Sequence, residues 1–290
     1  MKIGCGSVVF RKLSLKEALQ RIKDAKYEYI EIQATGPFCP HVDVDNDDPK
    51  KISEMIRNFG FREITALWAS HGAIIPDDLS MEYIKKSILW AKEAGIPIVH
   101  LSDGFKPEEI NEDEAWDIFE SRLSKLLETA EDTAEDNNVC LAIEPHGTFS
   151  LTPEGLERIM NISDSKCLGI NYDTANVHRA AYIETVNGKY ELKQTGNVHD
   201  EVETLKRIVK RVVHVHVKDI SSGAADAECV TLGTGVVNVK GCLKVLKENG
   251  YDGVISLETE GSYKELNVAQ KMIEDSRKYL ITVFKELNWS

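Results

Sequence analysis

Short apolar runs rich in valine and isoleucine alternate along the chain with longer stretches in which apolar residues recur at helical spacing. Runs of this length and composition are typical of strands that are buried on both faces, as in parallel sheets. We therefore expect eight strands, at Lys2 to Cys5, Tyr29 to Gln33, Ile64 to Trp68, Ile98 to Leu101, Val139 to Glu144, Leu168 to Asp173, Val212 to Val217 and Val254 to Glu258.

Helix start and stop signals lie between these runs. Ser14-Leu-Lys-Glu17 has the form of a capping box, and Pro49 and Pro153 stand where a first helical turn tolerates proline. Gly60 follows a helical stretch at the position where glycine adopts the left-handed conformation that ends a helix. The expected helices span residues 15–26, 49–59, 80–94, 112–136, 153–161, 201–210, 239–249 and 264–287.

The repeated alternation of strand and helix determines the expected fold. Eight such units joined by right-handed crossovers close most economically as a (β/α)₈ TIM barrel. A barrel of this kind needs about 250 residues, so we expect one domain over residues 1–290. An open doubly wound sheet is the alternative. It normally has a glycine-rich phosphate loop after its first strand, and the segment from Gly4 to Ser7 is a weak match.

Composition and charge argue against several classes of protein. Apolar residues make up 42% of the chain and charged residues 29%, as in ordinary soluble globular proteins, and no apolar run is long enough to span a membrane. The apolar start is too short and glycine-broken for a secretory signal. A net charge of −13 opposes binding to nucleic acid. The six cysteines form no C-x-x-C pair and fit a reducing, cytoplasmic compartment.

Four of the expected strands end in side chains that bind metal ions. They are Glu144, Asp173, His216 and Glu258, separated by 29, 43 and 42 residues, which is about one strand-and-helix unit each. Because chemistry in such barrels sits at the carboxyl ends of the strands, these side chains can converge on one divalent cation. A single acidic residue at a strand end is more commonly a helix cap or a solvated charge. The shared register of all four favours a joint site.

Five stretches in the second half of the chain carry a family resemblance. They are Ala142 to His146, Asn171 to Asn176, His214 to Asp219, Leu232 to Gly235 and Gly250 to Glu258. In this order they resemble the sugar phosphate isomerase/epimerase superfamily, the xylose-isomerase-like barrels that include ketose 3-epimerases, hydroxypyruvate isomerases, inosose dehydratases and apurinic endonucleases. The first half agrees only in its alternation, and the motifs do not single out one reaction.

The resemblance implies that Glu144, Asp173, His216 and Glu258 hold one divalent ion, commonly manganese, magnesium or cobalt, with zinc also compatible. It further implies that Glu144 and Glu258 are catalytic and move protons on opposite sides of a bound sugar. A cation on the substrate carbonyl stabilises an enediolate while a carboxylate takes the proton. We therefore expect a metal-dependent isomerase or epimerase of a small ketose or related polyhydroxy carbonyl compound. A lyase or dehydratase of a keto-inositol or keto-glycoside is the alternative, because it uses the same enediolate.

One position departs from the family pattern. Several relatives have histidine three residues after the aspartate ligand, where this chain has Asn176. Asparagine can hydrogen-bond a sugar hydroxyl but is a poor ligand for a second ion. This difference argues against a multi-metal endonuclease. A sugar-binding barrel without catalysis is a further alternative, and assembly into a homo-oligomer is left open.

Other residues near the strand ends are candidate substrate contacts. His146 closely follows Glu144, while His214 and Lys218 share the strand alternation of His216. Lys218 can bind an oxyanion or pair with the neighbouring Asp219.

Trp68 and His71 can form an aromatic wall against a sugar ring, although aromatic residues more commonly pack in the core. Glu31 can orient a ligand or belong to a polar layer inside the barrel. The long connections 177–200 and 220–238 are expected to be irregular, either as a partial lid or as surface loops.

Overall fold

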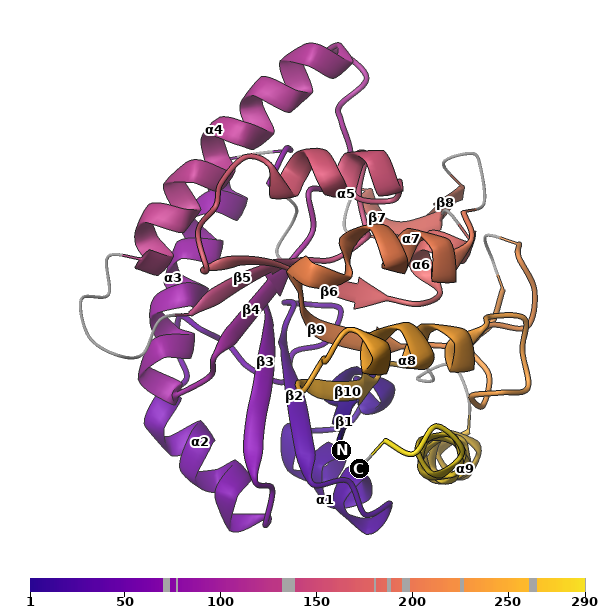
Figure 1. Ribbon diagram of the computed structural model, residues 1–290. Coiled ribbons are helices and arrows are strands. Elements are labelled where there is room, and N and C mark those ends of the chain that lie inside the picture. The colour runs from indigo at the N-terminus through magenta and orange to yellow at the C-terminus, as the bar shows by residue number, and fades with distance from the viewer. Residues whose placement is uncertain are drawn as a thin grey trace.

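A computed structural model describes residues 1–69, 74–76, 78–131, 139–179, 181–186, 189–194, 199–224, 227–260 and 265–289. Parallel strands close into a barrel in the order β1-β10-β9-β6-β5-β4-β3-β2 (Figure 1). The expected (β/α)₈ barrel is confirmed, and the open sheet is excluded because β1 pairs with both β10 and β2. The strands are β1 (Lys2–Gly6), β2 (Tyr29–Ala34), β3 (Glu63–Ala69), β4 (Ile98–Leu101), β5 (Cys140–Ile143), β6 (Leu168–Asp173), β9 (Val212–Val217) and β10 (Val254–Leu257).

Helices surround the strands (Figure 1). The capping box is present, since the backbone N–H of Ser14 donates to Glu17 Oε2 at 3.0 Å and the Ser14 side chain accepts from the Glu17 N–H. Each expected helix is found with ends shifted by a few residues, and the expected extension over residues 132–136 lies outside the described residues. The helices are α1 (Leu15–Asp24), α2 (Pro49–Asn58), α3 (Asp78–Ala94), α4 (Glu112–Glu131), α5 (Pro153–Met160), α7 (Glu201–Ile208), α8 (Val239–Glu248) and α9 (Leu266–Glu286), with 3-10 turns at η1 (Ser7–Phe10) and η2 (Val209–Arg211).

The expectation of an irregular connection over residues 177–200 was wrong. The chain there forms the short helix α6 (Asn176–Arg179) and an antiparallel hairpin of β7 (Ala181–Val186) and β8 (Lys189–Gln194). The missed signal is Asn187-Gly188 between two alternating runs, because this dipeptide favours a two-residue hairpin turn. The connection 220–238 is irregular in its described residues, apart from an isolated bridge between Ile220 and Cys229.

The large apolar core lies between the strands and the helices, whereas the interior of the barrel is polar. Leu19, Ile56, Phe119 and Leu246 are helix residues of the core with at most 1% exposure. Inside the barrel the strands carry polar or small side chains in register, with His100 beside Ala142, Asn171 beside His214 and Ser256 beside His216. The small residues leave room for the polar side chains. No helix in the described part of the chain has the length and apolar character needed to cross a membrane.

Candidate active site

The four side chains proposed as ligands come together at the carboxyl ends of their strands. Glu144 and Glu258 directly follow β5 and β10, Asp173 ends β6, and His216 is the penultimate residue of β9. Each offers one ligand atom, and these atoms all lie within 4.8 Å of one another. All four side chains are buried. The structure therefore brings together, in one cluster, residues that the sequence spreads over more than a hundred positions.

The atoms of this cluster face a common centre. His216 Nδ1 lies 3.5 Å from Glu144 Oε1, 3.6 Å from Glu258 Oε2 and 4.0 Å from Asp173 Oδ2. The other oxygen of Asp173, Oδ1, accepts the backbone N–H groups of Ala175 at 2.7 Å and Asn176 at 2.8 Å. Those two bonds hold the carboxylate in the orientation in which Oδ2 faces the cluster.

The chemistry of the cluster fits a divalent cation. Asp173 Oδ2 and both carboxylate oxygens of Glu258 are buried and accept no hydrogen bond from the described residues. Buried carboxylates need a compensating charge. The Lys218 ammonium supplies one, at 2.5 Å from Glu258 Oε2 and 3.0 Å from Asp173 Oδ2. Three carboxylate oxygens with one imidazole nitrogen are a donor set that suits manganese, magnesium or cobalt and is compatible with zinc.

The two glutamates differ in their affinity for protons. Burial raises the pKa of Glu258 to about 8, although Lys218 and His216 act in the opposite direction. Burial also opposes ionisation of Glu144, but the charge of His216 and the hydrogen bonds from His100 and His216 outweigh it and hold the pKa of that carboxyl well below its ordinary value. The two carboxyls therefore lie in different electrostatic surroundings.

Lys218 lies inside the cluster. Its side chain is 1% exposed, and its ammonium also lies 3.5 Å from Glu260 Oε1. The considered ion pair with Asp219 was wrong, because the described contacts of the Lys218 ammonium are to Asp173, Glu258 and Glu260. The carboxylate of Asp219 instead accepts backbone N–H groups from Ile220, Gly233, Gly235 and Val237.

The remaining candidate contacts lie around the cluster. Asn176 Nδ2 donates to Glu144 Oε1 at 3.1 Å, so this side chain holds a ligand in place. The rings of Trp68 and His146 meet edge to face with centroids 5.7 Å apart, and His146 is half-buried. Trp68 is 9% exposed and also contacts the ring of His100, so neighbouring side chains inside the barrel cover most of its surface. His71 lies outside the described residues.

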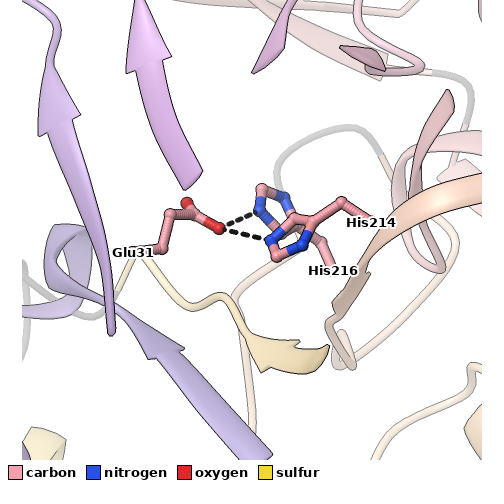
Figure 2. Close-up of side chains that lie close together, drawn as sticks. All are labelled: Glu31, His214 and His216. Carbon is pink, nitrogen blue, oxygen red and sulfur yellow. Dashed lines mark hydrogen bonds and ion pairs between the residues drawn. The ribbon is translucent and has the colours of Figure 1, made fainter. Parts of the chain in front are cut away.

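A second group of polar side chains, from Glu31, His214 and His216, lies close together inside the barrel (Figure 2). His214 does not join the four convergent residues. Its Nε2 atom lies 3.0 Å from Glu31 Oε2, and His216 Nε2 lies 2.7 Å from the same oxygen. His100 lies between two carboxylates, with Nε2 at 3.2 Å from Glu31 Oε1 and Nδ1 at 3.3 Å from Glu144 Oε2. Glu31 thus lies in a polar layer inside the barrel and contacts the proposed ligand His216, so its position fits both roles considered for it.

Sequence reasoning missed two interior residues, Gln33 and Asn171. Both are fully buried, and Gln33 Oε1 and Asn171 Oδ1 accept no hydrogen bond from the described residues. A signal for both was available in the strand alternation, since Gln33 follows Glu31 by two positions and Asn171 precedes Asp173 by two. Residues two apart on a strand share a face.

The chain matches the family model of the xylose isomerase-like TIM barrel over residues 19–282. The chain belongs to this family. The resemblance inferred from the sequence motifs is thereby confirmed. The relatives of this chain include inosose dehydratases and a D-tagatose 3-epimerase-like protein.

Individual relatives of this xylose isomerase-like barrel differ in how much of their length they share with it. An uncharacterized protein of Methanocaldococcus jannaschii is 29% identical over 292 residues, covering 97% of this chain and 89% of the relative. Inosose dehydratase of Clostridium botulinum is 25% identical over 184 residues, covering 58% of this chain and 54% of the dehydratase. A solved D-tagatose 3-epimerase-like protein has a TM-score of 0.75 and 28% identity, covering 99% of this chain and 100% of its own.

Proposed function

We propose that this protein is a divalent-metal-dependent isomerase or epimerase that acts on a small ketose or related polyhydroxy carbonyl compound. The observation that carries the proposal is the convergence of Glu144, Asp173, His216 and Glu258, which combines a cation site with two carboxylates able to move protons. The similarity to a D-tagatose 3-epimerase-like protein over nearly the whole chain supports the same class of reaction.

The arrangement suits proton transfer next to a carbonyl group. Glu144, Asp173, His216 and Glu258 would hold a divalent cation, whose positive charge would make the C–H bond next to the substrate carbonyl more acidic. Glu144 and Glu258 then act as base and acid. They follow β5 and β10, which are separated by β6 and β9 in the closed barrel, so the two carboxyls approach a substrate from different sides. Return of the proton to the opposite face gives an epimer, and return to the neighbouring carbon gives an isomer.

Other residues of the cluster hold these groups in place. Asn176 donates to Glu144, and Lys218 lies against Glu258 and Asp173. The Lys218 ammonium supplies a second positive charge where an oxyanion or a hydroxyl of the substrate approaches. Trp68 and His146 form an aromatic edge on which a sugar ring can pack. A small sugar or sugar-derived carbonyl compound is the substrate class that this combination of charge and aromatic surface fits best.

A dehydratase acting on a keto-inositol is the second candidate. The similarity to inosose dehydratases favours it, although the match spans about half of their length. The same removal of a proton beside a carbonyl begins this reaction, and loss of a β-hydroxyl then replaces return of the proton. The position of the leaving group relative to the removed proton separates the two reactions.

The test is incubation of the manganese-loaded protein with a panel of ketoses and keto-inositols in deuterated water, followed by NMR. Incorporation of deuterium without loss of a group supports the isomerase or epimerase, and formation of an unsaturated ketone supports the dehydratase. Glu258→Gln should abolish exchange, because it removes one proton-transferring carboxyl. Glu260→Gln is the matched control, since Glu260 contacts Lys218 without belonging to the convergent ligands. Full activity of Glu258→Gln, or of metal-stripped protein, would contradict the proposal.

A further inference from the structure

Glu31 occupies the interior of the barrel beneath the convergent ligands. It lies on β2, its side chain is completely buried, and it is surrounded by hydrogen-bonding groups from other strands. Its Oε2 atom lies 2.7 Å from His216 Nε2 and 3.0 Å from His214 Nε2 (Figure 2). Its Oε1 atom lies 3.2 Å from His100 Nε2 and accepts from Gln33 Nε2 at 3.2 Å. A carboxylate has enough lone pairs for the donors from His214, His216 and Gln33.

We propose that Glu31 is a positioning residue that holds the imidazole of His216 with Nε2–H on the glutamate and Nδ1 toward the metal ligands. The inference rests on the metal site of the proposed function. It assigns to Glu31 a role in metal binding, although Glu31 is not one of the four convergent residues.

The geometry of His216 distinguishes its two ring nitrogens. Nε2 is at hydrogen-bonding distance from Glu31, whereas Nδ1 faces Glu144 and Glu258 at 3.5 Å and 3.6 Å. A histidine that binds a metal through one nitrogen needs a partner for the N–H on the other, and that partner determines the tautomer and the orientation of the ring. With the proton on Nδ1 instead, a lone pair on Nε2 would face the Glu31 carboxylate inside the protein. Glu31 therefore selects the nitrogen that is offered to the cation.

Glu31 also reaches a second ligand. His100 lies between Glu31 and Glu144, and its Nδ1 atom is 3.3 Å from Glu144 Oε2. One buried carboxylate on β2 thus contacts His216 on β9 directly and Glu144 after β5 through one imidazole. A change at Glu31 should be transmitted to both ligands, while the fold of each strand is unchanged.

A second cation is the competing explanation of the same cluster. Ligand atoms of Glu31, His214 and His216 also lie within 4.8 Å of one another. That arrangement would require His216 to bridge two cations with both ring nitrogens deprotonated. The distances of 2.7 Å and 3.0 Å are those of ordinary hydrogen bonds, which need no such deprotonation. We therefore infer that Glu31 positions His216. The number of metal ions bound per chain distinguishes this role from a second cation site.

The first measurement compares metal affinity among variants by titration calorimetry with manganese. Glu31→Gln keeps the size of the side chain but places an N–H₂ group toward the imidazoles, so we expect affinity to fall roughly 10-fold to 100-fold. Glu31→Asp retains the charge and should recover part of the loss. Ser256→Ala is the control, because Ser256 contacts Glu31 at 3.4 Å and belongs to neither candidate metal group. Circular dichroism establishes that each variant is folded.

The second measurement is the ¹⁵N NMR spectrum of histidine-labelled, zinc-bound protein. We expect His216 to carry its proton on Nε2 and the metal on Nδ1. Coordination through Nε2, or equal manganese affinity in Glu31→Gln and unmodified protein, would overturn the inference. Two equivalents of metal in unmodified protein and one in Glu31→Gln would replace it with the second cation. If Glu31→Gln does not fold, the NMR measurement on unmodified protein decides alone.

The same experiments separate this inference from the proposed function. Metal binding with the expected histidine tautomer, but without deuterium exchange on any substrate, would refute the proposed reaction and leave the role of Glu31 intact. Deuterium exchange by unmodified protein, together with unchanged metal affinity in Glu31→Gln, would support the proposed reaction and refute the role of Glu31. Failure of unmodified protein to bind any divalent ion would overturn both.

Discussion

Replacing Asp219 with asparagine should strongly destabilise the protein. Asp219 is 1% exposed and immediately follows Lys218. Its Oδ2 atom accepts the N–H groups of Gly233 and Gly235, both at 2.9 Å, and its Oδ1 atom accepts the N–H of Val237 at 3.1 Å. These bonds attach the irregular segment 229–237 to the end of β9, next to the ligand cluster.

The size of the effect follows from the number of bonds lost. An asparagine presents one oxygen to these donors, and its N–H₂ group faces either the N–H groups of Gly233 and Gly235 or those of Ile220 and Val237. About two charge-assisted bonds are lost, each contributing about 1.5–3 kcal/mol, so the free energy of unfolding should fall by about 3–6 kcal/mol. At about 2–4 °C per kcal/mol, the midpoint of thermal unfolding should fall by about 6 to 24 °C.

Thermal unfolding followed by circular dichroism measures this change. Asp252→Asn is the matched control, because Asp252 is exposed and the substitution removes the same charge. Gly235→Ala should also destabilise, since a Cβ atom there would lie 2.2 Å from the Ile220 backbone oxygen and 2.3 Å from Asp219 Oδ1. Because the two substitutions disturb neighbouring atoms, their effects should not add fully. A fall of less than about 1 kcal/mol in Asp219→Asn, or an equal fall in the control, would refute the reasoning.

Three further predictions concern the site and the cysteines. His216→Ala removes the single nitrogen of the convergent ligands, so elemental analysis should return far less than the one metal per chain expected of unmodified protein, and an unchanged metal content would contradict the assignment. Asn176→Ala removes the donor to Glu144 at 3.1 Å and should weaken manganese binding roughly tenfold by calorimetry, whereas unchanged affinity would assign Asn176 no role in holding that ligand. Burial raises the pKa of Cys39 and Cys140 to about 12, so both should react with a thiol reagent at pH 8 far more slowly in native than in unfolded protein, and equal rates would show that they are accessible.

The sequence by itself determined the order and type of the elements that build the barrel. A strand buried on both faces must be apolar along its length, and a helix must have one apolar face, so both leave a periodicity in the chain. The spacing of Glu144, Asp173, His216 and Glu258 placed them at equivalent ends of strands for the same reason. The β7–β8 hairpin was also encoded locally, by Asn187-Gly188, but its signal was not used.

Only the tertiary structure decided which interior side chains touch. Glu31 meets His214 and His216 across 183 and 185 residues of sequence, and Lys218 pairs with Glu258 rather than with its neighbour Asp219. Such contacts depend on barrel closure and on strand register, which shifts between Ile30 and Glu31 and again between Ile170 and Asn171. Alternation specifies the face on which a side chain lies. It does not specify the register in which two strands pair, because that register depends on the packing of the whole barrel.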